Sequence, residues 1–84
     1  MSLTMENLNK CFNHAWDNEA NYIGVLFRIP RQDTHEVIIN SSSAFAAKQR
    51  FYKENYNDDL THSKVEGLRI VGFTYGKSFA EIEN

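Results

Sequence analysis

The feature that most constrains the fold is a strictly alternating apolar run in the first third of the chain. Four bulky apolar residues share one parity: Ile23, Val25, Phe27 and Ile29. A period of two residues is the pattern of a β-strand with one buried face. Pro30 follows directly, and proline suits a strand end because it has no N–H to give to the ladder. The pattern predicts a strand over residues 22–29.

Two segments show instead the three- and four-residue spacing of amphipathic helices. The apolar stripe of the first consists of Leu8, Cys11, Phe12, Ala15 and Trp16. It predicts a helix over residues 4–17, with Thr4 as the N-cap because a threonine hydroxyl accepts an N–H of the first turn. A second helix is predicted over residues 43–56, directly after a row of serines that also suit capping.

Two more strands are predicted over 36–40 and 68–75, where β-branched and aromatic residues gather. The loop before 36–40 is short, which favours an antiparallel hairpin with strand 22–29. The helix over 43–56 then links this hairpin to the third strand, as in a split β-α-β sheet. Strand 22–29 is expected in the centre, because its long apolar face would be costly at an edge. The expected strand order is 2-1-3.

A short terminal helix is predicted at the end of the chain, where Ser78 and Glu81 have the spacing of a capping box. The predicted fold class is α+β, in the order α-β-β-α-β-α, with the two main helices on one face of the sheet. A chain of 84 residues has room for one core, so residues 1–84 are expected to form a single domain. Residues 1–3 are interpreted as an addition ahead of the natural start, which would be Met5.

The overall charge and the cysteine count exclude several classes of protein. Nine basic and eleven acidic residues give a formal charge of −2, which is neither a cationic footprint for nucleic acid nor the acidic surface of a DNA mimic. No apolar run approaches the roughly 18–20 residues of a membrane span, so no membrane partner is expected. Cys11 is the only cysteine and cannot form an intramolecular disulfide, which favours a reducing, cytoplasmic location.

Side chains suited to catalysis or metal binding are few. The glycines match no phosphate-binding loop, and no serine lies in a nucleophile elbow. Two clusters carry suitable groups: Cys11, His14 and Asp17 on the first helix, and Asp58, Asp59 and His62 after the second. We interpret the first as a buried cysteine beside an exposed histidine, and the second as a helix-ending turn. No cofactor, metal or enzymatic activity is expected; a small metal-dependent enzyme using the second cluster is the least favoured alternative.

Two glycines interrupt predicted strands, Gly24 in the first and Gly72 in the third. An interior glycine weakens a strand unless a bulge or a closely approaching neighbour needs the space. We favour a bulge or a point of twist over a ligand contact at both positions.

The predicted strands carry more apolar surface than two helices can cover. The residues expected to face the helices are Ile23, Val25, Phe27, Val37 and Ile39. The opposite face then presents Tyr22, Leu26 and Ile38. The third strand is apolar on both parities, with Leu68 and Ile70 on one and Val71, Phe73 and Tyr75 on the other. Only the segment 79–82 remains to cover this surface.

An uncovered apolar face on the order of a few hundred Å² marks an association surface. We therefore expect a non-enzymatic interaction module that forms a homodimer or binds another protein through its sheet face or edge. The expected contact residues are Tyr22, Leu26, Ile38 and Ile70, with Arg28 at the rim. The alternative is that the C-terminal helix folds back and seals the face.

A nucleic-acid-binding accessory protein is the second hypothesis. The basic residues of the second predicted helix are Lys48, Arg50 and Lys53. They can contact phosphates, and Tyr52 or Tyr56 can stack on a base. Cations on the outer side of an amphipathic helix are also what solubility alone requires, so this hypothesis ranks below the interaction module.

The closing run from Gly67 to Ile82 and the segment from Asn21 to Val25 resemble short uncharacterised proteins carried by prophages and mobile elements of Gram-positive bacteria. The resemblance spans about half of the chain and contains no diagnostic motif. It implies a bacterial, phage-related accessory protein of the cytoplasm. No activity is known for that group, so no functional residue is carried over.

Overall fold

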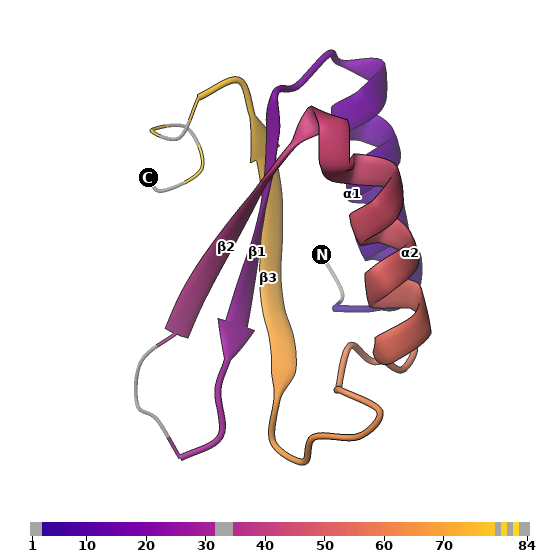
Figure 1. The fold of residues 1–84 in the computed structure, drawn as a ribbon, viewed down its shortest axis with the longest axis vertical. Helices are drawn as coiled ribbons and strands as arrows, with labels where there is room; N and C mark the ends of the chain where they lie inside the picture. Colours follow the sequence, from indigo (N-terminus) through magenta and orange to yellow (C-terminus); the bar gives the residue numbers. More distant parts are fainter. Residues whose placement is uncertain (1–2, 32–34, 79, 81, 83–84) are drawn as a thin grey trace.

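The structure is a computed structural model that describes residues 3–31, 35–78, 80 and 82. Its elements, in chain order, are α1 (Met5–Asp17), β1 (Tyr22–Arg28), β2 (His35–Ser41), a 3-10 turn η1 (Ser42–Ala44), α2 (Phe45–Asn55) and β3 (Arg69–Gly76). Figure 1 shows both helices on one face of the sheet. The α+β class and the placement of the helices are as predicted.

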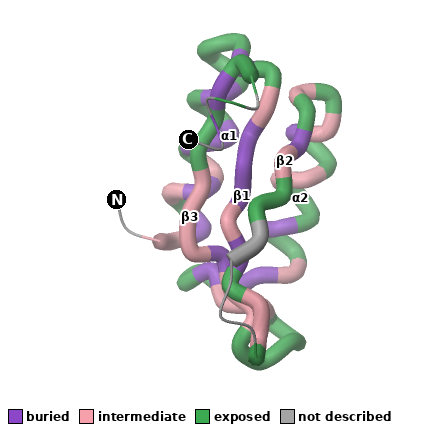
Figure 2. Tube along the Cα trace, turned by 90° about the vertical axis from the view of Figure 1, so that its left-hand side faces the viewer, coloured by how far each residue is buried: buried purple, intermediate pink, exposed green. Residues whose placement is uncertain are grey.

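The sheet has three strands in the order β2-β1-β3, and β1 is antiparallel to both neighbours. β2 and β3 therefore run in the same direction on either side of β1. The predicted order 2-1-3 and the central position of β1 are confirmed. The predicted parity of β1 is also confirmed, because Ile23, Val25 and Phe27 are buried whereas Arg28 is exposed. Figure 2 shows the middle of β1 as a continuous buried stretch.

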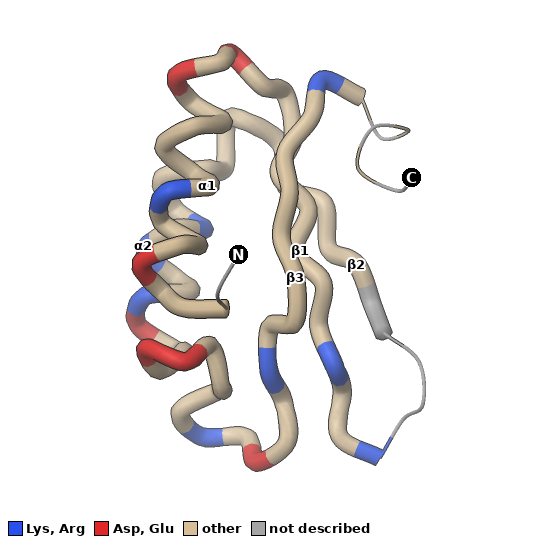
Figure 3. Tube along the Cα trace, turned by 180° about the vertical axis from the view of Figure 1, so that it is seen from behind, with Lys and Arg blue, Asp and Glu red and all other residues tan. Residues whose placement is uncertain are grey.

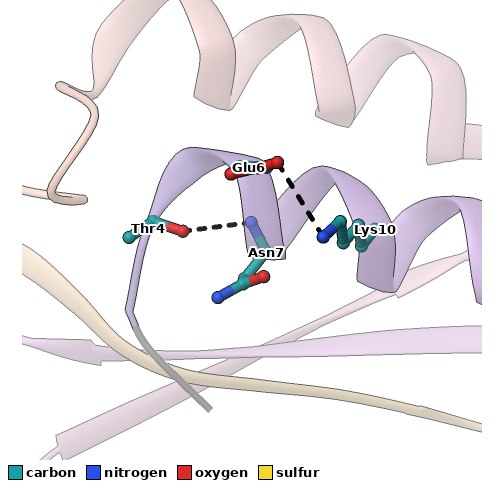
Figure 4. A network of polar contacts seen from close by, with 4 residues as sticks. All are labelled: Thr4, Glu6, Asn7 and Lys10. Carbon is teal, nitrogen blue, oxygen red and sulfur yellow. Dashed lines mark hydrogen bonds and ion pairs between the residues drawn. The ribbon is translucent and has the colours of Figure 1, made fainter.

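α1 forms where the apolar spacing predicted it. Thr4 caps the helix, since its Oγ1 accepts a hydrogen bond from the N–H of Asn7 at 3.2 Å. Glu6 and Lys10 form an exposed ion pair at 3.8 Å beside this cap (Figure 4). The buried residues of α1 include Leu8, Cys11, Phe12 and Ala15. Trp16 lies at the margin of this stripe and is 67% exposed, so its predicted place in the core is wrong.

α2 is shorter than predicted at its N-terminus, because residues 42–44 form a 3-10 turn before it. Its core side carries Phe45 and Tyr52, both buried. The rings of Phe12 on α1 and Phe45 on α2 pack edge to face at a centroid distance of 5.9 Å. This aromatic contact holds the two helices together above β1.

The register of β2 overturns one prediction. Val25 pairs with Ile38, and Leu26 pairs with Val37. Paired residues of antiparallel strands share a face, so Ile38 lies on the helix side while Val37 and Ile39 lie on the outer side. The opposite parity had been expected. Three consecutive apolar residues carry no parity signal, and a shift of one residue exchanges the faces of the whole strand.

β3 contains an irregularity whose exact position the sequence did not reveal. Leu26 pairs with Gly72 but Phe27 pairs with Ile70, so Val71 is an extra residue between the two pairs. This bulge turns both Ile70 and Phe73 toward the core, although the two have opposite parities. A bulge had been favoured for the glycine positions, and this one lies next to Gly72.

The outer face of the sheet is partly covered by the end of the chain. Ile82 is 9% exposed, and its side chain occupies the space where a Cβ of Gly24 would lie. Val37 borders the same space. The helix predicted to start at Ser78 falls largely on residues outside those described. Ile82 nevertheless gives Gly24 a packing role, since only glycine leaves room for it.

Candidate interaction site

The predicted contact residues do not form one surface. Tyr22 and Leu26 are half-buried on the outer face, and Arg28 is exposed there, opposite Arg69. Ile70 is fully buried in the core, because the bulge turns it toward the helices. It cannot contact a partner without unfolding, so its assignment as a surface anchor is corrected.

Ile38 is the second corrected position, since it lies on the helix side of the sheet and not on the outer face. Ile38 nevertheless remains accessible, because it lies in an edge strand and is 44% exposed. Val37, its neighbour on the outer side, is 46% exposed. Both faces of β2 therefore present an aliphatic side chain to solvent at the free edge of the sheet.

A pocket of about 250 Å³ opens between α2 and this edge. Its lining includes Phe27, Ile38, Lys48, Phe51, Tyr52 and Leu68. Of these residues, Tyr52 is buried, while Phe51 is 46% exposed. Lys48 holds its ammonium 5.2 Å from the centroid of the Phe51 ring, a cation–π contact. In Figure 2, α2 lies behind β2 and extends past its free edge. We call the pocket together with the free edge of β2 the α2–β2 groove.

The groove was not recognised from the sequence. Lys48 was expected with Arg50 and Lys53 on the outer side of the second helix. The i, i+3 spacing of Lys48 and Phe51 was the available signal, because residues three apart on a helix are neighbours. The position of Ile38 opposite them follows only from the strand register.

The three cations proposed for nucleic-acid binding are not brought to one surface. Lys48 faces the groove, whereas Arg50 and Lys53 line a shallow depression on another side of α2. Tyr52 and Tyr56 are buried, so neither is available to stack on a base. Figure 3 shows acidic and basic positions interspersed along the helical layer. Nucleic-acid binding stays a prediction without support from this geometry.

The cluster after α2 serves the structure of its own loop. Asp59 Oδ1 accepts hydrogen bonds from the hydroxyl and the backbone N–H of Thr61, at 2.6 and 3.1 Å, and these bonds lower the pKa of the Asp59 carboxyl. His62 Nδ1 accepts the N–H groups of Lys64 and Val65, both at 3.0 Å. Within the described part of the chain, no group of three or more His, Cys, Asp or Glu side chains is placed to hold a metal ion.

The burial of Cys11 predicts how the stability of the protein depends on pH. It is buried in α1, and burial raises the pKa of its thiol to about 11. Because the pKa is higher in the folded state, the unfolded chain loses the thiol proton at a lower pH. The stability that the buried thiol contributes is therefore fully present below the ordinary cysteine pKa, and it falls as the pH rises toward 11. Urea unfolding should show a loss of about 1 kcal/mol between pH 8 and pH 10.

The same burial should make Cys11 of the folded protein slow to react with maleimide, because the thiolate is the reactive form. Cys11→Ala should remove most of the loss between pH 8 and pH 10. The buried hydroxyls of Tyr52 and Tyr56, whose pKa values burial also raises, add a loss of the same sign at higher pH. Equal stability at pH 8 and pH 10, or fast labelling of the folded protein, would contradict this prediction.

No helix among the described residues has both the length and the apolar character needed to cross a membrane. No family model, curated protein or solved structure matches the chain. The α2–β2 groove is therefore assessed on its own geometry.

Proposed function

We propose that the chain is a non-enzymatic protein-interaction module that takes up a partner strand at the free edge of β2. The observation that supports this is the exposure of Val37 and Ile38 on the two faces of an edge strand. Natural edge strands are commonly protected by charges, proline or bulges. β2 carries Glu36 near its start, but the segment 37–40 contains no charged residue and no proline, so this part of the edge is open to pairing.

Strand addition would satisfy two needs at once. The unpaired backbone groups of β2 would gain hydrogen bonds, and the aliphatic side chains at the edge would lose contact with water. Another protein and a second copy of the chain both fit this proposal. A cytoplasmic location belongs to it as well, supported by the lone, reduced Cys11.

The matched pair Ile38→Lys and Val65→Lys tests this proposal. Both residues are aliphatic and β-branched, and they are equally exposed at 44% and 45%, but Val65 does not line the groove. We expect Ile38→Lys to weaken association at least about tenfold, since a buried isoleucine side chain contributes about 1.5–3 kcal/mol. Val65→Lys should leave association unchanged.

Light scattering over a wide concentration range reports self-association, and selection from a displayed library of peptides reports binding to other chains. Circular dichroism confirms that both variants fold. The proposal is wrong if the unmodified chain remains monomeric and enriches no peptide. It is equally wrong if any association found survives Ile38→Lys.

A further inference from the structure

We infer that the occupant of the α2–β2 groove is an extended peptide segment of another protein, apolar at its centre and acidic beside it, and not a second copy of this chain. The inference rests on the proposed function and makes it specific. The segment pairs its backbone with β2, places one apolar side chain in the pocket and sets a carboxylate against Lys48.

Ile38 belongs both to the free edge of the sheet and to the wall of the pocket. A strand added to β2 continues the pleat, so its alternate side chains point toward the helix layer. One of these side chains lies directly beside Ile38 and below Phe51. Backbone pairing and pocket filling are therefore performed by the same short segment, as in recognition by β-strand addition.

The size of the pocket favours peptide side chains over a small molecule. Its volume of about 250 Å³ lies below the range of about 300–1,000 Å³ that is typical of small-molecule sites. A space of this size suits one or two apolar side chains of a peptide better than a whole small molecule. The lining is mostly aromatic and aliphatic, with Lys48 as the charged residue among those described, which favours an apolar occupant with polar groups at the mouth.

The charge at the groove favours an acidic segment. Among the described residues the single ion pair is formed by Glu6 and Lys10, so Lys48 has no carboxylate partner there. Its ammonium is held over the ring of Phe51 at the side of the groove. Among the described side chains that line the pocket, none is acidic. An incoming segment with a carboxylate beside its apolar residue complements this arrangement, and a basic segment would be repelled.

The position of α2 disfavours a second copy of the chain as the occupant. Two copies joined through antiparallel β2 strands are related by a two-fold axis that keeps both α2 helices on the same face of the joined sheet. α2 extends past the free edge of β2 (Figure 2). Packed helices need about 8–10 Å between their axes, whereas paired strands are only about 4.8 Å apart. The two α2 helices would collide, and a segment without a helix avoids this.

Three blocked peptides of about six residues, the usual length of a strand, test the inference. The first has leucine at its centre, valine or threonine around it and glutamate near both ends. The second replaces the glutamates with lysine. The third keeps the glutamates but carries N-methyl groups on alternate backbone amides, which removes the donors needed for pairing. Amide NMR spectra of the intact chain follow each titration.

We expect the glutamate peptide to shift the amide signals of residues 37–40 and to bind more tightly than the other two. Lys48→Glu should weaken this peptide about fivefold and strengthen the lysine peptide by a similar factor. Lys53→Glu is the matched control, because it makes the same charge change on a side of α2 away from the groove; it should leave the preference unchanged.

Equal binding of the glutamate and lysine peptides overturns the inference, and so does unweakened binding of the N-methylated peptide. If no peptide binds at about 1 mM but the chain forms dimers that Ile38→Lys dissociates, a second copy is the occupant. The inference then fails while the proposed function stands. If neither peptides nor a second copy bind, both fail.

Discussion

Tyr52→Ala is expected to lower the free energy of unfolding by about 3–5 kcal/mol, the usual cost of truncating a buried aromatic residue. Tyr52 is 2% exposed. Its ring lies 6.1 Å from Phe12 on α1, 6.1 Å from Phe27 on β1 and 5.8 Å from Tyr56, measured between centroids. It therefore connects both helices to the central strand. Domains of this size have a total stability of about 4–13 kcal/mol, so the loss takes a large share of the total and unfolds much of the protein if its stability lies at the lower end. Urea unfolding followed by circular dichroism measures the loss.

Phe51→Ala is the matched control, because it removes an aromatic ring from the adjacent position of the same helix. Phe51 is 46% exposed, and we expect a loss of about 1 kcal/mol or less. Tyr52→Phe is a second control that keeps the ring and removes the hydroxyl, which accepts a long hydrogen bond of 3.5 Å from Asn40 Nδ2. It should cost about 1 kcal/mol. Similar losses for Tyr52→Ala and Phe51→Ala would show that the core is not organised around Tyr52.

This pair of residues also marks the limit of sequence reasoning about α2. Adjacent helical positions differ by about 100° around the axis, so two adjacent aromatic residues cannot both lie at the centre of the buried face. The sequence contains both and does not show which one is buried. The answer depends on where α1 and β1 lie relative to α2, which is a tertiary property. The same uncertainty concealed the groove, since Phe51 forms its side only because Tyr52 faces the core.

The central strand was predictable because its signal is local and redundant. Ile23, Val25 and Phe27 occupy alternate positions, so a strand places all three on one face, and that face is buried. Thr4 was predictable for a similar reason, since its side chain suits the helix N-terminus whatever the rest of the fold does. Features that depend on one strand alone, or on one helix end alone, could be derived from the sequence.

The register of β2 could not be derived from the sequence in this way. Residues 37–39 are all apolar, so only the hairpin geometry decides that Ile38 and not Val37 faces the helices. Asn40 then falls on the buried side, where the hydroxyl of Tyr52 accepts its side-chain N–H. A polar residue in a buried position is acceptable once it is hydrogen-bonded. That partner comes from another element, which a strand pattern does not reveal. The candidate site depends on these long-range details, so it was predicted less well than the fold.

Gly24→Ala is the other substitution expected to lower the stability strongly, because it displaces Ile82 near the end of the chain. A Cβ at this position would meet the Cγ2 atom of Ile82, which lies against the strand. We expect Ile82 to be displaced and the free energy of unfolding to fall by about 2 kcal/mol, the contribution of one buried aliphatic side chain. Gly72→Ala is the control in the neighbouring strand. Its Cβ would lie 3.6 Å from Leu26 Cδ2, an ordinary contact, so stability should change by no more than about 0.5 kcal/mol.

A double-mutant cycle with Ile82→Ala separates displacement of the chain end from a general cost of alanine in β1. If Gly24 is required because Ile82 occupies its side of the sheet, Gly24→Ala should cost little once Ile82 is truncated. The coupling between the two changes should then be about 1–2 kcal/mol. Additive losses would mean that Ile82 does not pack against the sheet in solution. In that case the outer face around Leu26 would be open to solvent, and a partner would have to cover that face as well as the edge of β2.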